Sequence, residues 1–122
     1  MAGRKGIEIW GTGTPRREFL HVDDCADALV FLLQTYSGNS HVNVGSGRDV
    51  TIAELAGLVM QAVGLDGSLS FDTSTPDGTP RKLMSGDTLA AMGWPPKIEL
   101  PPGLASPYYL LLHNRQTTGL PL

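Results

Sequence analysis

Two adjacent arginines, Arg16 and Arg17, follow a GTGTP turn and precede a short apolar run that ends at Asp23 and Asp24. A guanidinium is permanently charged, and its planar fork of N–H donors can bind two oxygens of a diphosphate at once. Neighbouring residues of an extended segment point to opposite sides, so one arginine can face a ligand while the other faces water. The spacing suggests binding of a phosphorylated ligand, with a solvated pair of arginines as the alternative.

A second cationic segment, STPDGTPRK, covers residues 74–82 and ends at Lys82. Its prolines restrict the backbone, and a restricted loop presents a binding group at a lower ordering cost than a flexible loop does. An ordinary surface loop explains the same composition. If this loop does bind the ligand, its cations act on the same anion as the arginine pair.

The other candidate motifs have simpler explanations. The GSG turn at residues 45–47 resembles a phosphate-binding turn, but the helix that follows lacks the third glycine of a dinucleotide fingerprint, so we interpret it as a plain turn. The three histidines lack metal-ligand spacing, and we expect no metal site. The single cysteine, Cys25, is interpreted as a small buried residue of a helix.

Composition excludes several classes of partner. The chain has 122 residues, 41% of them hydrophobic, and a net charge of -3, which is enough apolar content for a core but no basic excess for nucleic acid. No apolar run is long enough to span a bilayer, so no membrane partner is expected. One cysteine permits no intrachain disulfide, which agrees with a reducing compartment and a cytoplasmic location.

The pattern of apolar residues predicts short strands and several helices. Strands are expected over residues 7–10, 41–44 and 69–71, and residues 18–22 should be extended or irregular. A helix should begin at Asp23 or Asp24, whose carboxylates we interpret as caps for its first turn.

Three further helices are expected. The first has a capping box formed by Thr51 and Glu54 and a glycine stop at Gly64. A short helix should follow Ser85 as its cap. The last should run over residues 102–113, with Pro107 disturbing it.

Four blocks occur in one order, namely WGTGTPRREFLHVDD, HVNVGSG, DVTIAELA and FDTSTPDGTPRKLM. Together they resemble the C-terminal part of the GDP-L-fucose synthase family, which are NADP-dependent epimerase/reductases of the extended short-chain dehydrogenase/reductase group. REFLHVDD alone indicates only the wider NAD-dependent epimerase/dehydratase family, and PDGTPRK makes the resemblance more specific. It extends over residues 7–109.

The resemblance implies an α/β fold, namely part of a Rossmann-like sheet plus the small α/β substrate domain, with about four helices and several short strands. Residues 1–122 would be the substrate-binding portion, without the N-terminal glycine-rich part that binds the cofactor. The full-length family uses NADP(H) and is expected to form homodimers. The family epimerises C3 and C5 of GDP-4-keto-6-deoxy-D-mannose and then reduces C4 with NADPH, which combines isomerase and oxidoreductase activities.

Carried over by motif position, Trp10 would lie along the nucleotide-sugar and Arg17 would contact its diphosphate. Asp77 and Lys82 belong to the block on the substrate side, and the resemblance implies that both bind the substrate. The resemblance makes Arg17 the arginine that faces the ligand and Arg16 the one that faces water.

The family's catalytic Ser and Tyr-x-x-x-Lys do not occur in this sequence, so no catalytic or cofactor-binding residue is assigned and the chain is expected to be inactive alone. Two alternatives stay open: a portion of another nucleotide-sugar epimerase or dehydratase, and a non-catalytic nucleotide-sugar-binding module. If a sheet of a larger protein normally covers the first helix and the segment 41–44, apolar side chains there should be exposed. These are Leu29, Leu32, Leu33, Val42 and Val44.

Overall fold

The structure is a computed structural model, and it describes residues 6–118. The helices are α1 (Val22–Thr35), α2 (Ile52–Val63), α3 (Asp87–Ala91) and α4 (Leu100–Thr118), and the strands are β1 (Gly6–Trp10), β2 (Arg16–Glu18), β3 (Asp49–Thr51), β4 (Ser68–Asp72) and β5 (Arg81–Lys82). The expected mixture of helices and short strands is confirmed. The strands expected at residues 7–10 and 69–71 are present as β1 and β4.

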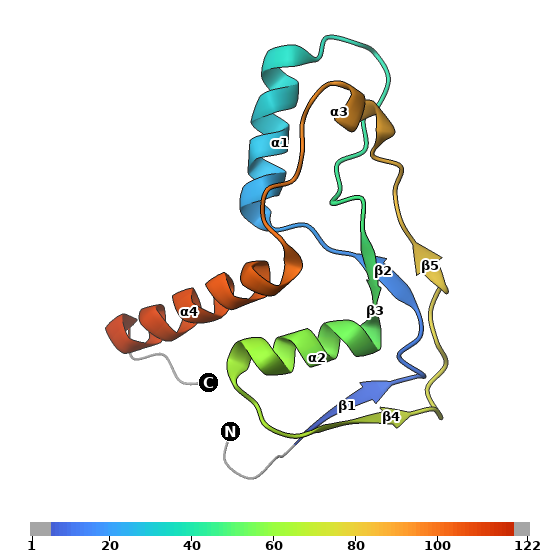
Figure 1. The fold of residues 1–122 in the computed structure, drawn as a ribbon, viewed down its shortest axis with the longest axis vertical. Helices are drawn as coiled ribbons and strands as arrows, with labels where there is room; N and C mark the ends of the chain where they lie inside the picture. Colours follow the sequence, from blue (N-terminus) through green and yellow to red (C-terminus); the bar gives the residue numbers. More distant parts are fainter. Residues whose placement is uncertain (1–5, 119–122) are drawn as a thin grey trace.

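The strands form two small sheets along one side of the molecule (Figure 1). β1 pairs in parallel with β4, while β2 lies between antiparallel β3 and parallel β5. As a result, the segments 6–18 and 68–82 run side by side through both sheets. We call these two stretches the paired segments.

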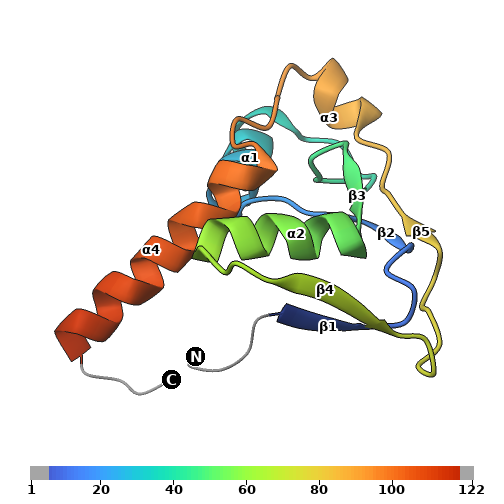
Figure 2. The same ribbon diagram turned by 60° about the horizontal axis from the view of Figure 1, so that its bottom comes forward.

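Helix α2 lies beside the β1–β4 sheet and packs against α4 (Figure 2). Its local signals behave as expected: Thr51 and Glu54 form both hydrogen bonds of the capping box, and Gly64 ends the helix at φ 69°. The backbone N–H groups of Ile52 and Ala53 donate to the carbonyls of Pro15 and Gly13, at 3.0 Å each. The start of α2 is therefore fixed on the turn between β1 and β2.

The interpretation of Asp23 and Asp24 as helix caps is wrong. The N-cap of α1 is His21, whose Nδ1 accepts a hydrogen bond from the Asp23 N–H at 3.1 Å. Asp24 is only 3% exposed, and its Oδ2 accepts the backbone N–H groups of Lys97 and Ile98 at 3.0 and 2.8 Å. Asp24 thus joins α1 to the chain that leads into α4, 73 residues further on.

Ala28, Leu89 and Trp94 form a small core between α1, α3 and the segment after α3. Asp27 of α1 accepts the indole N–H of Trp94 at 2.9 Å, which satisfies the polar edge of that buried ring. Helix α1 therefore contacts α3 and the segment after it in two ways, by apolar packing of Ala28 and by the hydrogen bond of Asp27.

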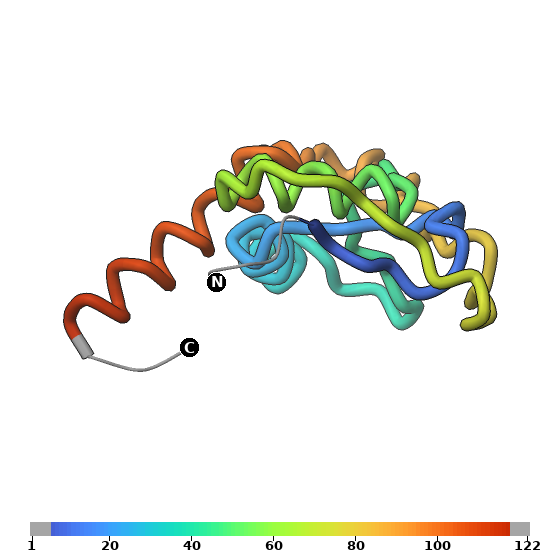
Figure 3. The backbone as a smooth tube through the Cα atoms, turned by 90° about the horizontal axis from the view of Figure 1, so that it is seen from below, coloured from blue at the N-terminus to red at the C-terminus, as the bar shows by residue number. Residues whose placement is uncertain are grey.

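Several local expectations are wrong. Residues 41–44 are irregular, although Val42 and Val44 pack against the core as strand residues would. The N-cap residue of helix α3 is Gly86 rather than Ser85, although Ser85 Oγ still accepts a long hydrogen bond of 3.5 Å from the Asp87 N–H. Helix α4 continues through Pro107 and is longer at both ends than expected. Its second half extends away from the rest of the described chain (Figure 3).

The expected exposure of apolar residues holds only for part of the set. Leu29 and Leu33 on the outer side of α1 are 58% and 85% exposed. Leu32, Val42 and Val44 are instead packed against the small core, because α3 and the segment after it cover that side of α1.

Candidate functional site

The turn between β1 and β2 is held in place by the facing loop of the other paired segment. Gly11 has a positive φ of 88°, a conformation that glycine adopts without steric cost. Its N–H donates to the carbonyl of Asp72 at 2.8 Å, and the N–H of Arg16 donates to Pro80 at 2.8 Å. These bonds continue the contact between the paired segments beyond the strands themselves.

Asp77 closes this connection from the side of the loop. Its carboxylate accepts the backbone N–H of Thr12 at 2.8 Å and the Thr12 hydroxyl at 2.6 Å. The hydrogen bond from the Thr12 side chain is the main reason that the pKa of Asp77 lies below its ordinary value. Both carboxylate oxygens are thus directed at the turn.

Arg17 and Lys82 are direct partners in the parallel register of β2 and β5. Paired residues of neighbouring strands project from the same face of a sheet, so the two cations leave the same face side by side. Nη1 of Arg17 also donates to the carbonyls of Arg16 and Thr79, at 2.7 and 2.6 Å. The guanidinium is therefore held against the loop that leads into β5.

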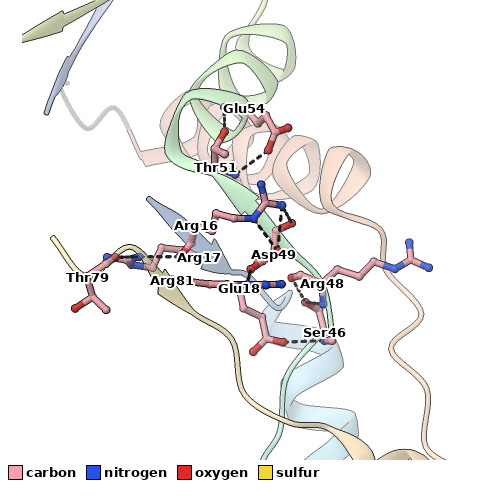
Figure 4. Close-up of polar contacts among 11 residues, drawn as sticks. Arg16, Arg17, Glu18, Ser46, Arg48, Asp49, Thr51, Glu54, Thr79 and Arg81 are labelled. Atoms are coloured by element: carbon pink, nitrogen blue, oxygen red, sulfur yellow. Dashed lines mark hydrogen bonds and ion pairs between the residues drawn. The ribbon is translucent and has the colours of Figure 1, made fainter. Parts of the chain in front are cut away.

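Arg16 and Arg81, the preceding register pair, serve a carboxylate on the opposite face (Figure 4). Asp49 of β3 lies between them: Arg16 Nε donates to its Oδ1 at 3.1 Å and Arg81 Nε to its Oδ2 at 2.6 Å. The Asp49 side chain is 5% exposed, and the hydrogen bond from Arg81 is the largest cause of its lowered pKa. Arg16, which was expected to face water, has a 40%-exposed side chain and also forms an ion pair with Asp49.

Trp10 ends β1 and is paired with Asp72, with 74% of its surface exposed. A large aromatic ring at the end of a strand gives a flat apolar surface that a ring of a ligand can contact. All four sequence-based site residues therefore lie on the paired segments. Trp10 lies at the sheet end before the turn, Asp77 contacts the turn, and Arg17 and Lys82 follow it.

Sequence reasoning missed Asp49, Arg81 and Thr12, which contact the site residues or their strands. Arg81 adjoins Lys82 in the PRK motif, so alternation along an extended strand could have indicated that it faces away from Lys82. Nothing local to the sequence links Asp49 to Arg81, 32 residues away.

The GSG turn is occupied by a carboxylate of the chain itself. The N–H of Gly47 donates to Oε2 of Glu18 at 2.8 Å, and the side chain of Glu18 also fills the space beside Gly45. A turn whose N–H already binds a carboxylate is poorly suited to a phosphate. This supports its interpretation as a structural turn.

Two cavities of the described chain border neighbours of the paired cations, Leu83 in one and Val50 in the other, but not the cations themselves. One, of about 330 Å³, lies between the GSG turn and α3, and another, of about 540 Å³, lies between β3 and the start of α4. Neither is lined by a sequence-based site residue. Within residues 6–118 no group of three His, Cys, Asp or Glu side chains is placed to hold a metal ion, and no helix there has the length and apolar character needed to cross a membrane.

Residues 1–45 match the NAD dependent epimerase/dehydratase family. The chain is 57% identical over 112 residues to GDP-L-fucose synthase 1 of Arabidopsis thaliana. The aligned region covers 92% of this chain and 35% of that protein. The chain is also similar to the solved structure of a GDP-mannoheptose C4 reductase from Campylobacter jejuni with NADP bound, at 42% identity and a TM-score of 0.76, covering 88% of this chain and 35% of the other. The solved structure of a GDP-L-fucose synthetase from Naegleria fowleri bound to NADP has a TM-score of 0.84 at 22% identity, and the match covers 92% of this chain and 36% of that one. At this identity the similarity supports the fold alone.

These similarities define the class: the chain has the fold of a portion of an extended short-chain dehydrogenase/reductase, with the mixed α/β content expected from the sequence. Within that class, the resemblance to GDP-L-fucose synthase is confirmed at the level of sequence. The chain spans about a third of the length of the curated relatives that it matches.

Proposed function

We propose that this chain supplies the GDP-sugar-binding portion of a GDP-L-fucose synthase. The reaction would be C3 and C5 epimerisation of GDP-4-keto-6-deoxy-D-mannose followed by NADPH reduction at C4. The observation that carries the proposal is the register of β2 and β5, which puts Arg17 and Lys82 side by side on one face. In this proposal the two cations bind the diphosphate of the nucleotide-sugar.

Charge supports this assignment. A sugar-nucleotide diphosphate carries about two negative charges, and each good hydrogen bond to a charged group contributes about 1.5–3 kcal/mol. Across the three strands the same face carries Val50, Arg17 and Lys82, so no carboxylate stands in that row. The two positive charges of the row therefore match the charge of the ligand.

The bonds of Arg17 in the free chain are compatible with ligand binding. Both of them use Nη1 and end on backbone carbonyls, so they orient the guanidinium without neutralising it. The other N–H groups of the fork can then address phosphate oxygens. Trp10, exposed at the end of β1, is assigned to the flat part of the nucleotide-sugar.

Asp77 belongs to the substrate side by its place in the loop, and we assign it an indirect role. Both of its oxygens are directed at Thr12, and a carboxylate that touched the diphosphate would repel it. Asp77 would therefore support binding by holding the loop that carries Lys82.

The solved reductase from Campylobacter jejuni with NADP bound supports use of NADP(H) by the complete enzyme. We assign no residue of this chain to the cofactor or to catalysis, since the family's Ser and Tyr-x-x-x-Lys are not in its sequence. The chain's own part would be to bind and orient the GDP-sugar, and alone it would be inactive. A homodimeric, cytoplasmic complete enzyme is part of the same proposal.

Calorimetric titration of the chain with GDP tests the proposal. Arg17→Ala should weaken binding by about 1.5–3 kcal/mol, which is about 10- to 150-fold. Arg48→Ala is the matched control, because Arg48 is a 79%-exposed arginine paired with Glu99. This substitution also removes one positive charge, but at a position outside the β2–β5 face, and should change the affinity little. Equal affinity of the wild type and Arg17→Ala would refute the role of Arg17.

A further inference from the structure

The position of Lys82 depends on a very short strand. β5 has only two residues, Arg81 and Lys82, and both are exposed. It lies at the edge of its sheet and pairs in parallel with β2. Parallel pairs are slightly weaker per residue than antiparallel ones, and two residues provide few ladder bonds. The pairing of β5 therefore needs support from outside the strand.

Two carboxylates supply that support from either end of the segment that carries Lys82. Asp77, five positions before Lys82 in the sequence, is bound to the N–H and the hydroxyl of Thr12. Asp49 binds Arg81, the immediate neighbour of Lys82, and holds Arg16 of β2 with its other oxygen. One carboxylate thus fixes the loop on the turn, and the other fixes β5 on β2.

The bond between Asp49 and Arg81 also determines which face Lys82 occupies. Side chains alternate along a strand, so when Arg81 lies on the face of Asp49, Lys82 must project from the opposite face. A slip of β5 by one residue would exchange the two and remove Lys82 from the side of Arg17.

Both carboxylates would disfavour an anionic ligand if they were unpaired. Asp49 lies between two guanidinium groups, and together the three side chains keep one net positive charge. Asp77 is directed at the turn by its bonds to Thr12. Because both carboxylates are paired, two acidic residues can lie close to the cations that are assigned to the diphosphate.

We propose that Asp49 and Asp77 are positioning residues that hold β5 in register, so that Lys82 adjoins Arg17 for binding the diphosphate. This inference rests on the proposed function, because it assigns these residues to the same site. They act through Lys82 and do not contact the ligand.

A double-mutant cycle with GDP as the probe tests this coupling. Lys82→Ala should lower GDP affinity about tenfold or more. Asp49→Asn and Asp77→Asn should each lower it too, but by no more than Lys82→Ala does. In the Lys82→Ala background, either Asn substitution should add little further loss. Asp77→Glu, which keeps the carboxylate, should retain more affinity than Asp77→Asn. Full additivity of the losses would overturn the proposal.

Hydrogen exchange without ligand tests the register independently of the proposed function. The N–H of Arg16 donates to Pro80, just before β5, and its protection should fall in both Asn variants. The N–H of Leu65, which donates to Met60 at the end of α2, reports a general loss of stability and should change less. Unchanged protection of Arg16 would overturn the inference. Absence of GDP binding by the wild type would instead refute the proposed function, and the exchange data would still decide whether the carboxylates hold β5.

Discussion

Replacement of Asp24 by Ala should destabilise the fold strongly, although Asp24 is one of two adjacent acidic residues at a helix start. Its carboxylate is 3% exposed and accepts two backbone N–H groups, those of Lys97 and Ile98. An unsatisfied donor costs about 1–3 kcal/mol, so two of them cost about 2–6 kcal/mol. Water can reach partly buried N–H groups, which favours the lower half of that range. Even so, this is a large share of the about 5–15 kcal/mol typical of a domain.

Asp23→Ala is the matched control for this prediction. The Asp23 side chain is 78% exposed, and its only ion pair within the described chain is a 3.8 Å contact with His21. Its replacement should change the free energy of unfolding by about 0.5 kcal/mol or less. Asp24→Asn keeps an oxygen that can accept both N–H groups and should fall between the two variants.

Urea unfolding followed by far-UV circular dichroism measures all three variants. If the two aspartates acted as caps and as charges at the positive end of α1, both Ala variants would lose similar, small amounts of about 0.5–1 kcal/mol. Equal losses for Asp23→Ala and Asp24→Ala would therefore refute the assignment of Asp24 to the Lys97–Ile98 backbone.

Two further predictions concern other contacts of the fold. An Ala side chain at Gly45 would displace the Glu18 carboxylate and disturb its hydrogen bond from the Gly47 N–H, so Gly45→Ala should destabilise by about 0.5–1.5 kcal/mol. Gly57→Ala in α2 meets no atom within 4 Å and should stabilise by about 0.5–1 kcal/mol. Thermal melts that order these two variants the other way would contradict the role of the Glu18 contact. Acid should also weaken the fold, because a pKa that is lower in the folded state contributes stability above the unfolded value, about 3.9, and this stability is lost as the pH falls through the folded value. For Asp49 and Asp77 the lowering comes chiefly from hydrogen bonds of Arg81 and of Thr12. The urea concentration at the unfolding midpoint should therefore decrease when the pH is lowered below about 4. This decrease should be smaller for Asp49→Asn than for the wild type. Equal decreases would show that the ion pair does not contribute.

The sequence predicted those parts of the fold whose determinants are close together along the chain. Both ends of α2 depend on residues within a few positions, namely the Thr51–Glu54 capping box and Gly64, and both were correct. The role of Asp24 was missed because its partners are 73 and 74 residues away. Periodicity indicates a buried face but cannot name the backbone that a carboxylate will reach.

The same distinction applies to the segment 41–44 and to β5. Val42 and Val44 alternate like strand residues and do pack inward, but no neighbouring strand among the described residues pairs with them, so they form no strand. β5 has too few residues to give a pattern, and Asp49, which accepts a hydrogen bond from Arg81, lies 32 positions earlier in the sequence. The candidate residues Arg17 and Lys82 could be named from motifs, whereas their adjacency required the register.

The two arginines of the first motif lie on opposite faces of β2, and the two faces differ in their charge. Because β2 is extended, Arg16 and Arg17 leave opposite faces, and only the face of Arg16 carries a carboxylate, Asp49, within reach. In the row across that face, Thr51, Arg16 and Arg81, Asp49 compensates one of the two positive charges. The row across the other face has two cations and no carboxylate, so its positive charge is left for an external anion. Burial of such a charge excess inside a fold would be costly, but on an exposed face it costs little and favours a ligand of about two negative charges.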